Sequence, residues 1–331
     1  MEKQKKMNKV LSGMRPTGRL HLGHYFGALK NWVELQNKFN NQCYYMIADW
    51  HALTTEYDNV DRINENTLEM LADWISIGID PKKSIIFKQS EVPLHSELFL
   101  ILTMITPLNW LYRCPTYKEQ IKEIKNKNLK NFGFLGYPIL MSADILLYRA
   151  NIVPVGKDQL AHLEFTREIV RRFNSFYGKM FDEPIGQITK YAKIPGIDGR
   201  KMSKSYNNSI LLGEDIDVLN YKVKNMFTDP LKIRKTDKGH FSNCVVFAFL
   251  KAFDENCENL QKNCENGTIS CMQCKKQLME IISEFIKPLN KKRIYLLKNK
   301  SYLNEILKEG CQKAAIIATE TIKDVRNAIK L

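Results

Sequence analysis

Short apolar segments alternate with amphipathic segments in the first half of the chain, and this alternation restricts the fold more than any other feature. Residues 9–13, 42–48 and 84–87 are apolar runs of strand length. Residues 23–39 and 61–77, which separate them, carry apolar side chains at helical spacing. Strands that alternate with helices in this way build parallel sheets. The pattern therefore predicts an α/β fold with a Rossmann-like, doubly wound parallel sheet.

The division of the chain follows from where the strand patterns stop. Residues 152–156 form one more apolar run that leads into a helix, whereas the segment before them carries mainly helical patterns. After residue 209 the pattern is helical to the end, without clear strands. The predicted divisions are a Rossmann-type catalytic domain over residues 1–205 with a helical insertion at about 93–150, an all-helical domain over 206–305, and a C-terminal helix over 306–331.

The charge balance favours a polyanionic partner. Lysine and arginine number 50 against 36 aspartates and glutamates, a net charge of +14, and each phosphate that a basic side chain neutralises releases counterions. The abundance of lysine and asparagine can also reflect the nucleotide composition of the gene. No apolar run reaches the roughly 18 residues of a membrane span, and residues 1–9 lack the apolar core of a secretory signal. We therefore expect a cytoplasmic protein with no membrane contact.

A glycine- and histidine-bearing segment, Gly13 to His24, follows the first predicted strand and opens the first predicted helix. Free backbone N–H groups and the helix dipole attract phosphate at such a position. Gly13 and Gly23 allow the backbone and a nucleotide to approach closely. His21 and His24 are about one turn apart, so both rings can donate hydrogen bonds to the same phosphoryl oxygens. The alternative is a purely structural helix cap.

A second basic motif, Lys201-Met202-Ser203-Lys204-Ser205, lies about 180 residues later. It belongs to a hydrophilic segment rich in glycine, serine and asparagine, residues 190–209, which predicts a mobile surface loop. Two lysines three residues apart can converge on one pyrophosphate group, and a loop that closes over it can stabilise the leaving group. Alone, such a motif is equally typical of a solvated loop.

Together the two motifs resemble the signatures of class I aminoacyl-tRNA synthetases, and the chain from about residue 9 onward is similar to the tryptophanyl-tRNA synthetase family. The similarity extends through Gln89–Pro93, Tyr137–Leu146 and Val155–Gln159. It implies ATP-dependent activation of L-tryptophan to tryptophanyl-adenylate, with Mg²⁺ on the phosphates, and transfer to tRNA(Trp). It also implies a homodimer, whose interface we expect within residues 93–135.

The resemblance assigns roles around ATP residue by residue. His21 and His24 would contact the phosphates, and Lys201 and Lys204 would hold the leaving pyrophosphate. Most bacterial members of the family carry Gln at the position of Arg15, so the contact of Arg15 with ATP or with the substrate carboxylate is an open question. The remaining ATP-binding candidates are Gly13, Arg15, Gly23, Gly156 and Asp158 (ribose), Ile194 (adenine) and Ser203.

The same resemblance predicts the pocket for the amino acid. Met141 and Asp144 lie on one face of a predicted helix, and the Asp144 carboxylate can accept the indole N–H, which has no lone pair to offer. Asp144 could equally accept a phenol O–H or cap a neighbouring helix. Met141 favours tryptophan, because related tyrosine enzymes tend to carry Gln there and a thioether suits a large apolar ring. The candidate substrate residues are Leu11, His51, Tyr137, Met141, Asp144, Val153 and Gln159, the last for the amino group.

Five of the eight cysteines fall between positions 244 and 274. Cys264, Cys271 and Cys274 end in a Cys-x2-Cys pair, a spacing that suits zinc or an iron–sulfur cluster. A subset of the family resembles this pattern and binds a [4Fe-4S] cluster, which implies Cys244 as the fourth ligand. Cys257 is a rival, and zinc or no metal are the alternatives. The other three, Cys43, Cys114 and Cys311, are predicted to be buried thiols.

The basic segments suggest where tRNA would bind. The resemblance places the anticodon arm on the helical domain, whose basic residues include Lys275, Lys276, Lys291, Lys292 and Arg293. The lysine-rich segment Lys118–Lys130 would lie near the acceptor end. A regulatory relative without catalysis is one alternative, and a nucleic-acid-binding metalloprotein is another. A regulatory relative would not need intact ATP motifs, and a nucleic-acid-binding metalloprotein does not explain why these motifs are present.

Overall fold

The computed structural model describes residues 8–40, 42–123, 127–156, 159–189, 194–254 and 257–331. Its centre is a five-stranded, fully parallel sheet in the order β3-β2-β1-β4-β5. The strands are β1 (Val10–Met14), β2 (Cys43–Ile47), β3 (Ile85–Lys88), β4 (Ile152–Val155) and β5 (Ile185–Ile188). The doubly wound parallel sheet that the sequence predicts is therefore confirmed.

The strand order places a crevice where the chain changes direction. β1 pairs with β2 on one side and with β4 on the other, and ligands of such sheets bind beyond the carboxyl ends of the strands at this switch point. All five residues of β2 are buried, as expected for a parallel strand that helices cover on both faces. β5 was not predicted, because Ile185 and Ile188 are largely exposed on an edge strand and leave no apolar run.

Helices of the first half surround the sheet. They are α1 (Leu22–His24), α2 (Lys30–Lys38), α3 (Asp49–Glu56) and α4 (Asp61–Ser76), with the 3-10 turn η2 (Gln89–Glu91) after β3. The single helix predicted over 23–39 is interrupted, because a π-helical segment, η1 (Tyr25–Leu29), lies between α1 and α2. Such a wide turn inside a helix often accompanies a functional site.

A set of helices separates β3 from β4. It consists of α5 (Leu94–Ile105), α6 (Leu108–Arg113), α7 (Pro115–Glu123), α8 (Phe132–Leu135) and α9 (Tyr137–Leu147), and α10 (Leu160–Tyr177) follows β4. α5 packs along α9, and α10 packs on the other side of α9. The apolar faces of these helices form one of the two cores of the molecule, together with the inner side of the sheet.

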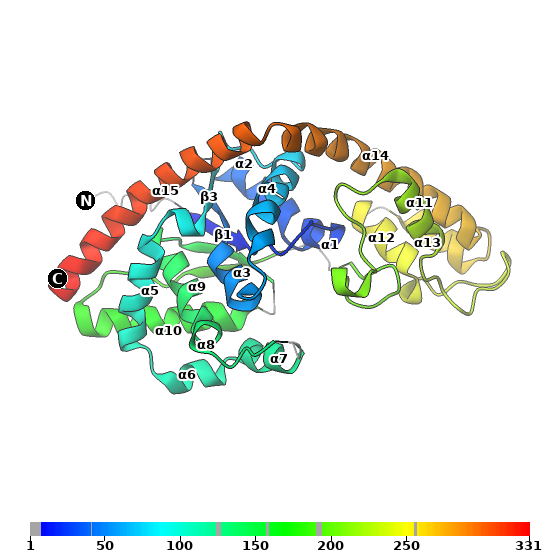
Figure 1. Ribbon diagram of the computed structural model, residues 1–331. Coiled ribbons are helices and arrows are strands. Elements are labelled where there is room, and N and C mark those ends of the chain that lie inside the picture. The colour runs from blue at the N-terminus through cyan, green and yellow to red at the C-terminus, as the bar shows by residue number, and fades with distance from the viewer. Residues whose placement is uncertain (1–7, 41, 124–126, 157–158, 190–193, 255–256) are drawn as a thin grey trace, which may run out of the picture.

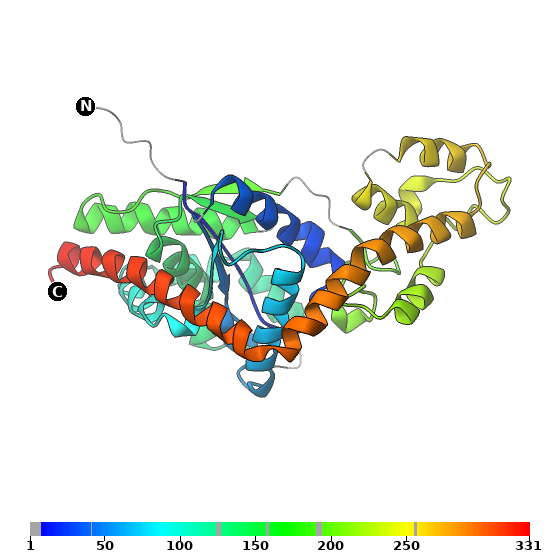
Figure 2. The same cartoon turned by 90° about the horizontal axis from the view of Figure 1, so that it is seen from above.

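The chain after β5 is helical among the described residues. It contains the 3-10 turns η4 (Lys204–Tyr206) and η5 (Phe241–Asn243) and the helices α11 (Ile216–Lys224), α12 (Val245–Phe253), α13 (Glu258–Glu265), α14 (Cys271–Lys298) and α15 (Lys300–Ile329). α11 to α13 and the start of α14 form a small lobe, from which α14 and α15 arch back over the sheet (Figures 1 and 2). Ser270 caps α14 through a reciprocal pair of hydrogen bonds with Gln273.

The last helix covers the edge strand of the sheet. α15 packs against β3 more extensively than any other pair of elements in contact, and Figure 1 shows it alongside this strand. Gly310 faces the backbone of Ile86 so closely that a Cβ atom would overlap the Ile86 carbonyl. Only glycine fits there. None of the described helices is long and apolar enough to cross a membrane.

A buried ion pair joins α14 to α4. The Arg293 guanidinium donates to Asp73 at 2.7 Å, and Asp73 Oδ2 in turn accepts the backbone N–H of Leu20 at 3.3 Å. Burial raises the pKa of Asp73 to about 6, against the opposing effect of Arg293. The expectation that Arg293 belongs to an exposed tRNA-binding surface was therefore wrong, since this side chain connects the helical half to the glycine- and histidine-bearing segment.

Candidate active site

One cavity of about 330 Å³ opens at the carboxyl edge of the sheet, beside β1 and β4. It is lined by every residue predicted for the amino acid: Leu11, His51, Tyr137, Met141, Asp144, Val153 and Gln159. Three of the predicted ATP residues, Gly13, Arg15 and Gly156, line the same cavity. Asp158 lies outside the described residues. The cavity thus joins the expected amino-acid end to the start of the expected nucleotide end.

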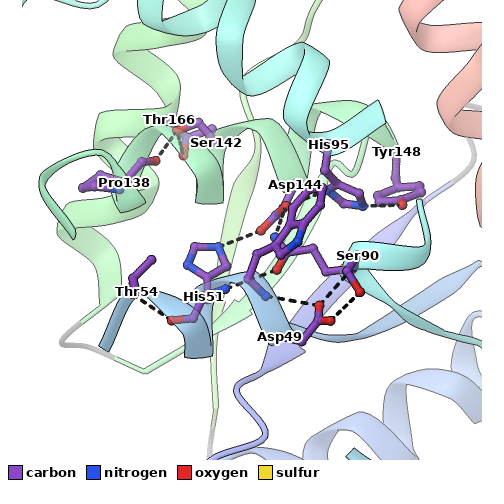
Figure 3. Close-up of polar contacts among 12 residues, drawn as sticks. Asp49, His51, Thr54, Ser90, His95, Pro138, Ser142, Asp144, Tyr148 and Thr166 are labelled. Atoms are coloured by element: carbon purple, nitrogen blue, oxygen red, sulfur yellow. Dashed lines mark hydrogen bonds and ion pairs between the residues drawn. The ribbon is translucent and has the colours of Figure 1, made fainter. Parts of the chain in front are cut away.

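Asp144 forms the polar floor of this cavity (Figure 3). Its side chain is buried, and it accepts hydrogen bonds on both oxygens. His51 Nε2 lies 2.9 Å from Oδ2, while Gln89 Nε2 and His95 Nδ1 lie 2.8 and 2.6 Å from Oδ1. Burial alone would raise the pKa of Asp144, but the hydrogen bonds from His51 and His95 hold it below its ordinary value. The cavity therefore offers an ionised carboxylate.

Gln89, His95 and Tyr148 are parts of the site that the sequence analysis missed. Gln89 lies in a segment that carries the family resemblance, so a signal was present although no role was given to it. His95 and Tyr148 contact each other through His95 Nε2 and the Tyr148 hydroxyl at 2.7 Å. Nothing in the local pattern of either residue indicates this pair, because they are 53 positions apart and meet only through the packing of α5 on α9.

A second hydrogen-bonded chain lies at the opposite wall. Tyr137 is within 2.7 Å of His162 Nε2, and His162 Nδ1 is 2.8 Å from Gln159 Oε1. Burial raises the pKa of Tyr137, so its hydroxyl keeps its proton. If that proton is donated to His162, the lone pairs of Tyr137 can accept from a ligand ammonium group. His162, which lines the cavity, was not among the predicted residues.

The two histidines of the first motif lie together at the start of α1. Their ring centroids are 3.8 Å apart. Burial, and then the Lys204 ammonium, lowers the pKa of His21 to about 4, and burial, then His21 and Lys204, lowers the pKa of His24 to about 3. The His21 backbone N–H donates to His24 Nδ1 at 3.2 Å, so Nε2 carries the proton of this neutral ring. Both rings are thus uncharged hydrogen-bond donors at neutral pH.

The second motif packs on the first. The Gly23 backbone N–H donates to the sulfur of Met202 at 3.3 Å, and Lys204 Nζ donates to the Thr17 carbonyl at 2.9 Å. A Cβ atom at position 23 would lie 2.9 Å from the His21 ring, which explains the glycine. Lys201 is exposed, and the Ser203 N–H donates to Asn208 Oδ1 at 2.8 Å. Of the segment predicted to be mobile, residues 190–193 lie outside the described residues.

Backbone hydrogen bonds explain why motifs so distant in sequence come together. The Leu22 N–H donates to the Ile210 carbonyl at 2.8 Å, and the Leu212 N–H donates to the Leu20 carbonyl at 3.0 Å. These bonds attach the end of the lysine-bearing loop to the turn before α1. Ile194, the candidate near the adenine, is buried in the same core as Met202 and Ile210. The phosphate end is therefore assembled from two separate segments.

A second small cavity lies in the helical lobe, and four thiols border it: Cys244, Cys264, Cys271 and Cys274. Cys257 is not among its lining residues. Burial, followed by the three neighbouring thiols, raises the pKa of Cys274 to about 12. Within the part of the chain that is described, no three His, Cys, Asp or Glu side chains are arranged to hold one metal ion. The cysteines predicted as buried thiols, Cys43, Cys114 and Cys311, are buried.

Comparison with known proteins agrees with the fold. The family model described as tRNA synthetases class I (W and Y) matches residues 3–287. The chain therefore belongs to the class I tRNA synthetases of the tryptophan and tyrosine group.

Curated relatives within this group include tryptophan--tRNA ligases. The chain is 44% identical to the tryptophan--tRNA ligase of Thermotoga maritima, over 98% of this chain and 99% of that protein. It is 40% identical to the tryptophan--tRNA ligase of Aquifex aeolicus, over 98% and 100%. Among solved structures, it is similar to Campylobacter jejuni tryptophanyl-tRNA synthetase complexed with ADP and tryptophan, with a TM-score of 0.86, 36% identity and coverage of 98% and 100%.

Proposed function

We propose that this chain is a tryptophan--tRNA ligase, which uses ATP to activate L-tryptophan to tryptophanyl-adenylate and transfers it to tRNA(Trp). The observation that carries this conclusion is the cavity beside β1 and β4. An ionised, buried Asp144 and apolar side chains line it, together with Gly13 and Arg15 from the start of the first phosphate motif, on which the second motif packs. The full-length similarity to tryptophan enzymes supports the same reaction.

The first step is attack of the tryptophan carboxylate on the α-phosphorus of ATP. The bond from phosphorus to the bridging oxygen breaks, and pyrophosphate leaves. The carboxylate is already ionised, so no general base is needed. The side chains of the protein position the reactants and stabilise charge: His21 and His24 donate to phosphate oxygens, while Lys201 and Lys204 neutralise the leaving group. Mg²⁺ would neutralise further phosphate charge when bound with ATP.

The amino-acid end fixes the orientation of tryptophan. The indole N–H donates to Asp144 Oδ2, the oxygen with the single bond from His51. Tyr137 and Gln159, which belong to one hydrogen-bonded chain through His162, accept from the ammonium group. Met141 lies on the cavity wall beside the ring. In the second step, the 3′-terminal ribose hydroxyl of tRNA attacks the adenylate carbonyl and AMP leaves.

The test is ATP–pyrophosphate exchange with each amino acid in turn, followed by aminoacylation of tRNA(Trp). We expect exchange that depends on tryptophan and is not supported by tyrosine. Exchange with tyrosine alone would show a tyrosyl enzyme. The absence of exchange with any amino acid would show a regulatory relative, in spite of its intact motifs.

We further propose a cytoplasmic homodimer whose interface includes α5 and α6. The side chains of Leu100, Met104, Leu108 and Tyr112 are 51–72% exposed on these helices. A row of large apolar groups at this level of exposure is typical of a protein interface. Sedimentation of the wild type as a dimer, and of a Met104→Glu variant as a monomer, would support this interface.

For tRNA, we propose that the exposed lysines Lys276 and Lys291 of α14 meet the anticodon arm. In the segment predicted for the acceptor end, Lys118, Lys122 and Lys130 are exposed. Its Lys127 is paired with Glu56 at 3.0 Å and with Asp58 at 2.8 Å.

The four cysteines around the second cavity are the proposed ligands of a [4Fe-4S] cluster. They come from the residue before α12, the last turn of α13 and the first turn of α14, so a cluster would cross-link these elements. All four thiols border one small cavity of the helical lobe. Gly239, whose Cβ atom would overlap the Cys264 sulfur, keeps the space clear.

Absorption of anaerobically purified protein tests the cluster. A broad absorption band at about 400 nm, with about four irons per chain, would support the cluster. A Cys257→Ser variant should keep the iron, whereas a Cys244→Ser variant should lose it. Colourless, iron-free protein would contradict the assignment of a [4Fe-4S] cluster. One zinc ion per chain would show that the four cysteines bind zinc instead.

A further inference from the structure

Two buried side chains that do not line the cavity form a hydrogen-bonded chain that ends on Asp144. His95 is completely buried, and its two ring nitrogens contact Asp144 Oδ1 at 2.6 Å and the Tyr148 hydroxyl at 2.7 Å. Tyr148 is also fully buried and stacks on Tyr44. Figure 3 shows His95 and Tyr148 on the side of Asp144 away from His51.

The geometry of the chain fixes the carboxylate at two points. Asp144 lies in α9 and Tyr148 caps its end, so the two residues are one helical turn apart on the same face. His95 lies in the first turn of α5 and bridges them. The imidazole therefore cannot turn without breaking a hydrogen bond at one end, and α5 and α9 cannot slide without disturbing both.

The direction of each hydrogen bond follows from the acceptor. An ionised carboxylate only accepts, so His95 Nδ1 carries a proton in either charge state of the ring. In the neutral ring, Nε2 then accepts from the Tyr148 hydroxyl. The tautomer with an unprotonated Nδ1 would direct a lone pair at the carboxylate. The Asp144 carboxylate thus selects the tautomer, and Tyr148 provides the hydrogen-bond donor that the other ring nitrogen then needs.

The consequence concerns which oxygen remains for a ligand. A carboxylate has about four lone-pair positions. Oδ1 accepts two hydrogen bonds, from His95 and Gln89, whereas Oδ2 accepts one, from His51. Only Oδ2 keeps a free position toward the cavity, where one N–H donor can bind.

We infer that His95 and Tyr148 are positioning residues for tryptophan specificity, which hold Asp144 so that Oδ2 alone is presented to the indole N–H. This inference rests on the proposed function. It adds two residues outside the cavity lining to those that determine the substrate.

Kinetics of ATP–pyrophosphate exchange on the full chain test the inference. His95→Gln moves the amide N–H away from the place of Nδ1, and KM for tryptophan should rise about 10- to 100-fold, as for loss of a hydrogen bond to a charged group. The kcat and the KM for ATP should change by less than about threefold. His95→Asn keeps an N–H at the place of Nδ1 and should recover most of the loss.

Tyr148→Phe should raise KM for tryptophan about 3- to 10-fold, since it removes a hydrogen bond between neutral groups. Tyr44→Phe is the matched control, because Tyr44 stacks on Tyr148 and lies outside the hydrogen-bonded chain. We expect no change in KM for this variant.

A substrate analogue separates positioning from general damage to the pocket. In β-(3-benzothienyl)-L-alanine, sulfur replaces the indole N–H, so this ligand cannot donate to Asp144. By calorimetry, His95→Gln should weaken tryptophan binding and leave analogue binding within about twofold. Equal loss for both ligands, or an unchanged KM for tryptophan, would overturn the inference. A wild type without tryptophan-dependent exchange would instead contradict the proposed function.

Discussion

The two ends of the active-site cavity are built in opposite ways. At the amino-acid end, the Asp144 carboxylate is saturated on one oxygen and hydrogen-bonded on the other before any ligand is present. At the phosphate end, buried His21 Nδ1 has no hydrogen-bond partner among the described residues, and Lys201 extends into solvent. Under the proposed function, recognition of the amino acid would therefore be preorganised, whereas stabilisation of the phosphates would be completed by the nucleotide itself.

The strongest test of this difference removes the cations of the phosphate end. In a Lys201→Ala, Lys204→Ala double variant, the rate of ATP–pyrophosphate exchange should fall by about 10³-fold or more, because charge on the leaving pyrophosphate is no longer compensated. Tryptophan binding, measured by calorimetry without ATP, should stay within about twofold. Lys313→Ala, an exposed position on α15, is the control and should behave as the wild type.

The complementary change acts on the amino-acid end. Asp144→Asn replaces one acceptor oxygen by an N–H₂ group that opposes the donors around it, so KM for tryptophan should rise about 100-fold or more. The KM for ATP should change little, because Asp144 does not contact the phosphate motifs. Asp61→Asn, on the exposed start of α4, provides the matched charge change. A large effect of Asp144→Asn on ATP would show that the two ends are not independent.

The dependence of stability on pH should come from the phosphate end. The pKa of His21 is lowered to about 4 and that of His24 to about 3, against about 6.5 in the unfolded chain. Between these values the unfolded state binds more protons, so stability decreases as pH falls from about 6.5 toward 4. Each histidine accounts for about 2 kcal/mol between pH 7.5 and 5, so urea unfolding should show a loss about 4 kcal/mol larger in wild type than in His21→Gln, His24→Gln. Parallel loss in both proteins would locate the dependence elsewhere.

The smallest effect is expected at the apolar wall of the amino-acid end. Met141→Gln places an amide in a slot that offers it few partners, and KM for tryptophan should rise about tenfold. Met141→Leu conserves volume and should change KM by less than about threefold. Comparison of tryptophan with tyrosine in both variants would show whether residue 141 contributes to the choice of substrate or only to affinity.

The sequence predicted most of the sheet because buried parallel strands leave continuous apolar runs. β1 to β4 were placed within a residue or two, whereas exposed β5 left no such signal. The π-helical turn η1 also escaped prediction, since its residues have the same apolar spacing as a regular helix. Local patterns therefore identify strands and helices that are buried in the usual way and fail where burial or helical geometry is unusual.

Candidate residues within recognisable motifs come together around the cavity, whereas the residues that contact Asp144 from outside the lining were not predicted. Asp144 and Gln159 lie in motifs and line the cavity. His95 and Tyr148 lie behind it, and only the packing of α5 on α9 brings them together. Arg293 was placed on a basic surface from charge alone, yet a buried carboxylate on α4 turns it inward. Charge composition does not reveal which cation has a buried partner.

The close contact between Gly310 and the Ile86 carbonyl has a consequence for synthesis of the protein. β3 is a free edge of the sheet until α15 covers it, and uncovered edges pair with other chains. The ribosome synthesises β3 long before α15, so the unpaired backbone groups of β3 stay uncovered during most of translation. The β3 edge is therefore covered only after α15 has been synthesised.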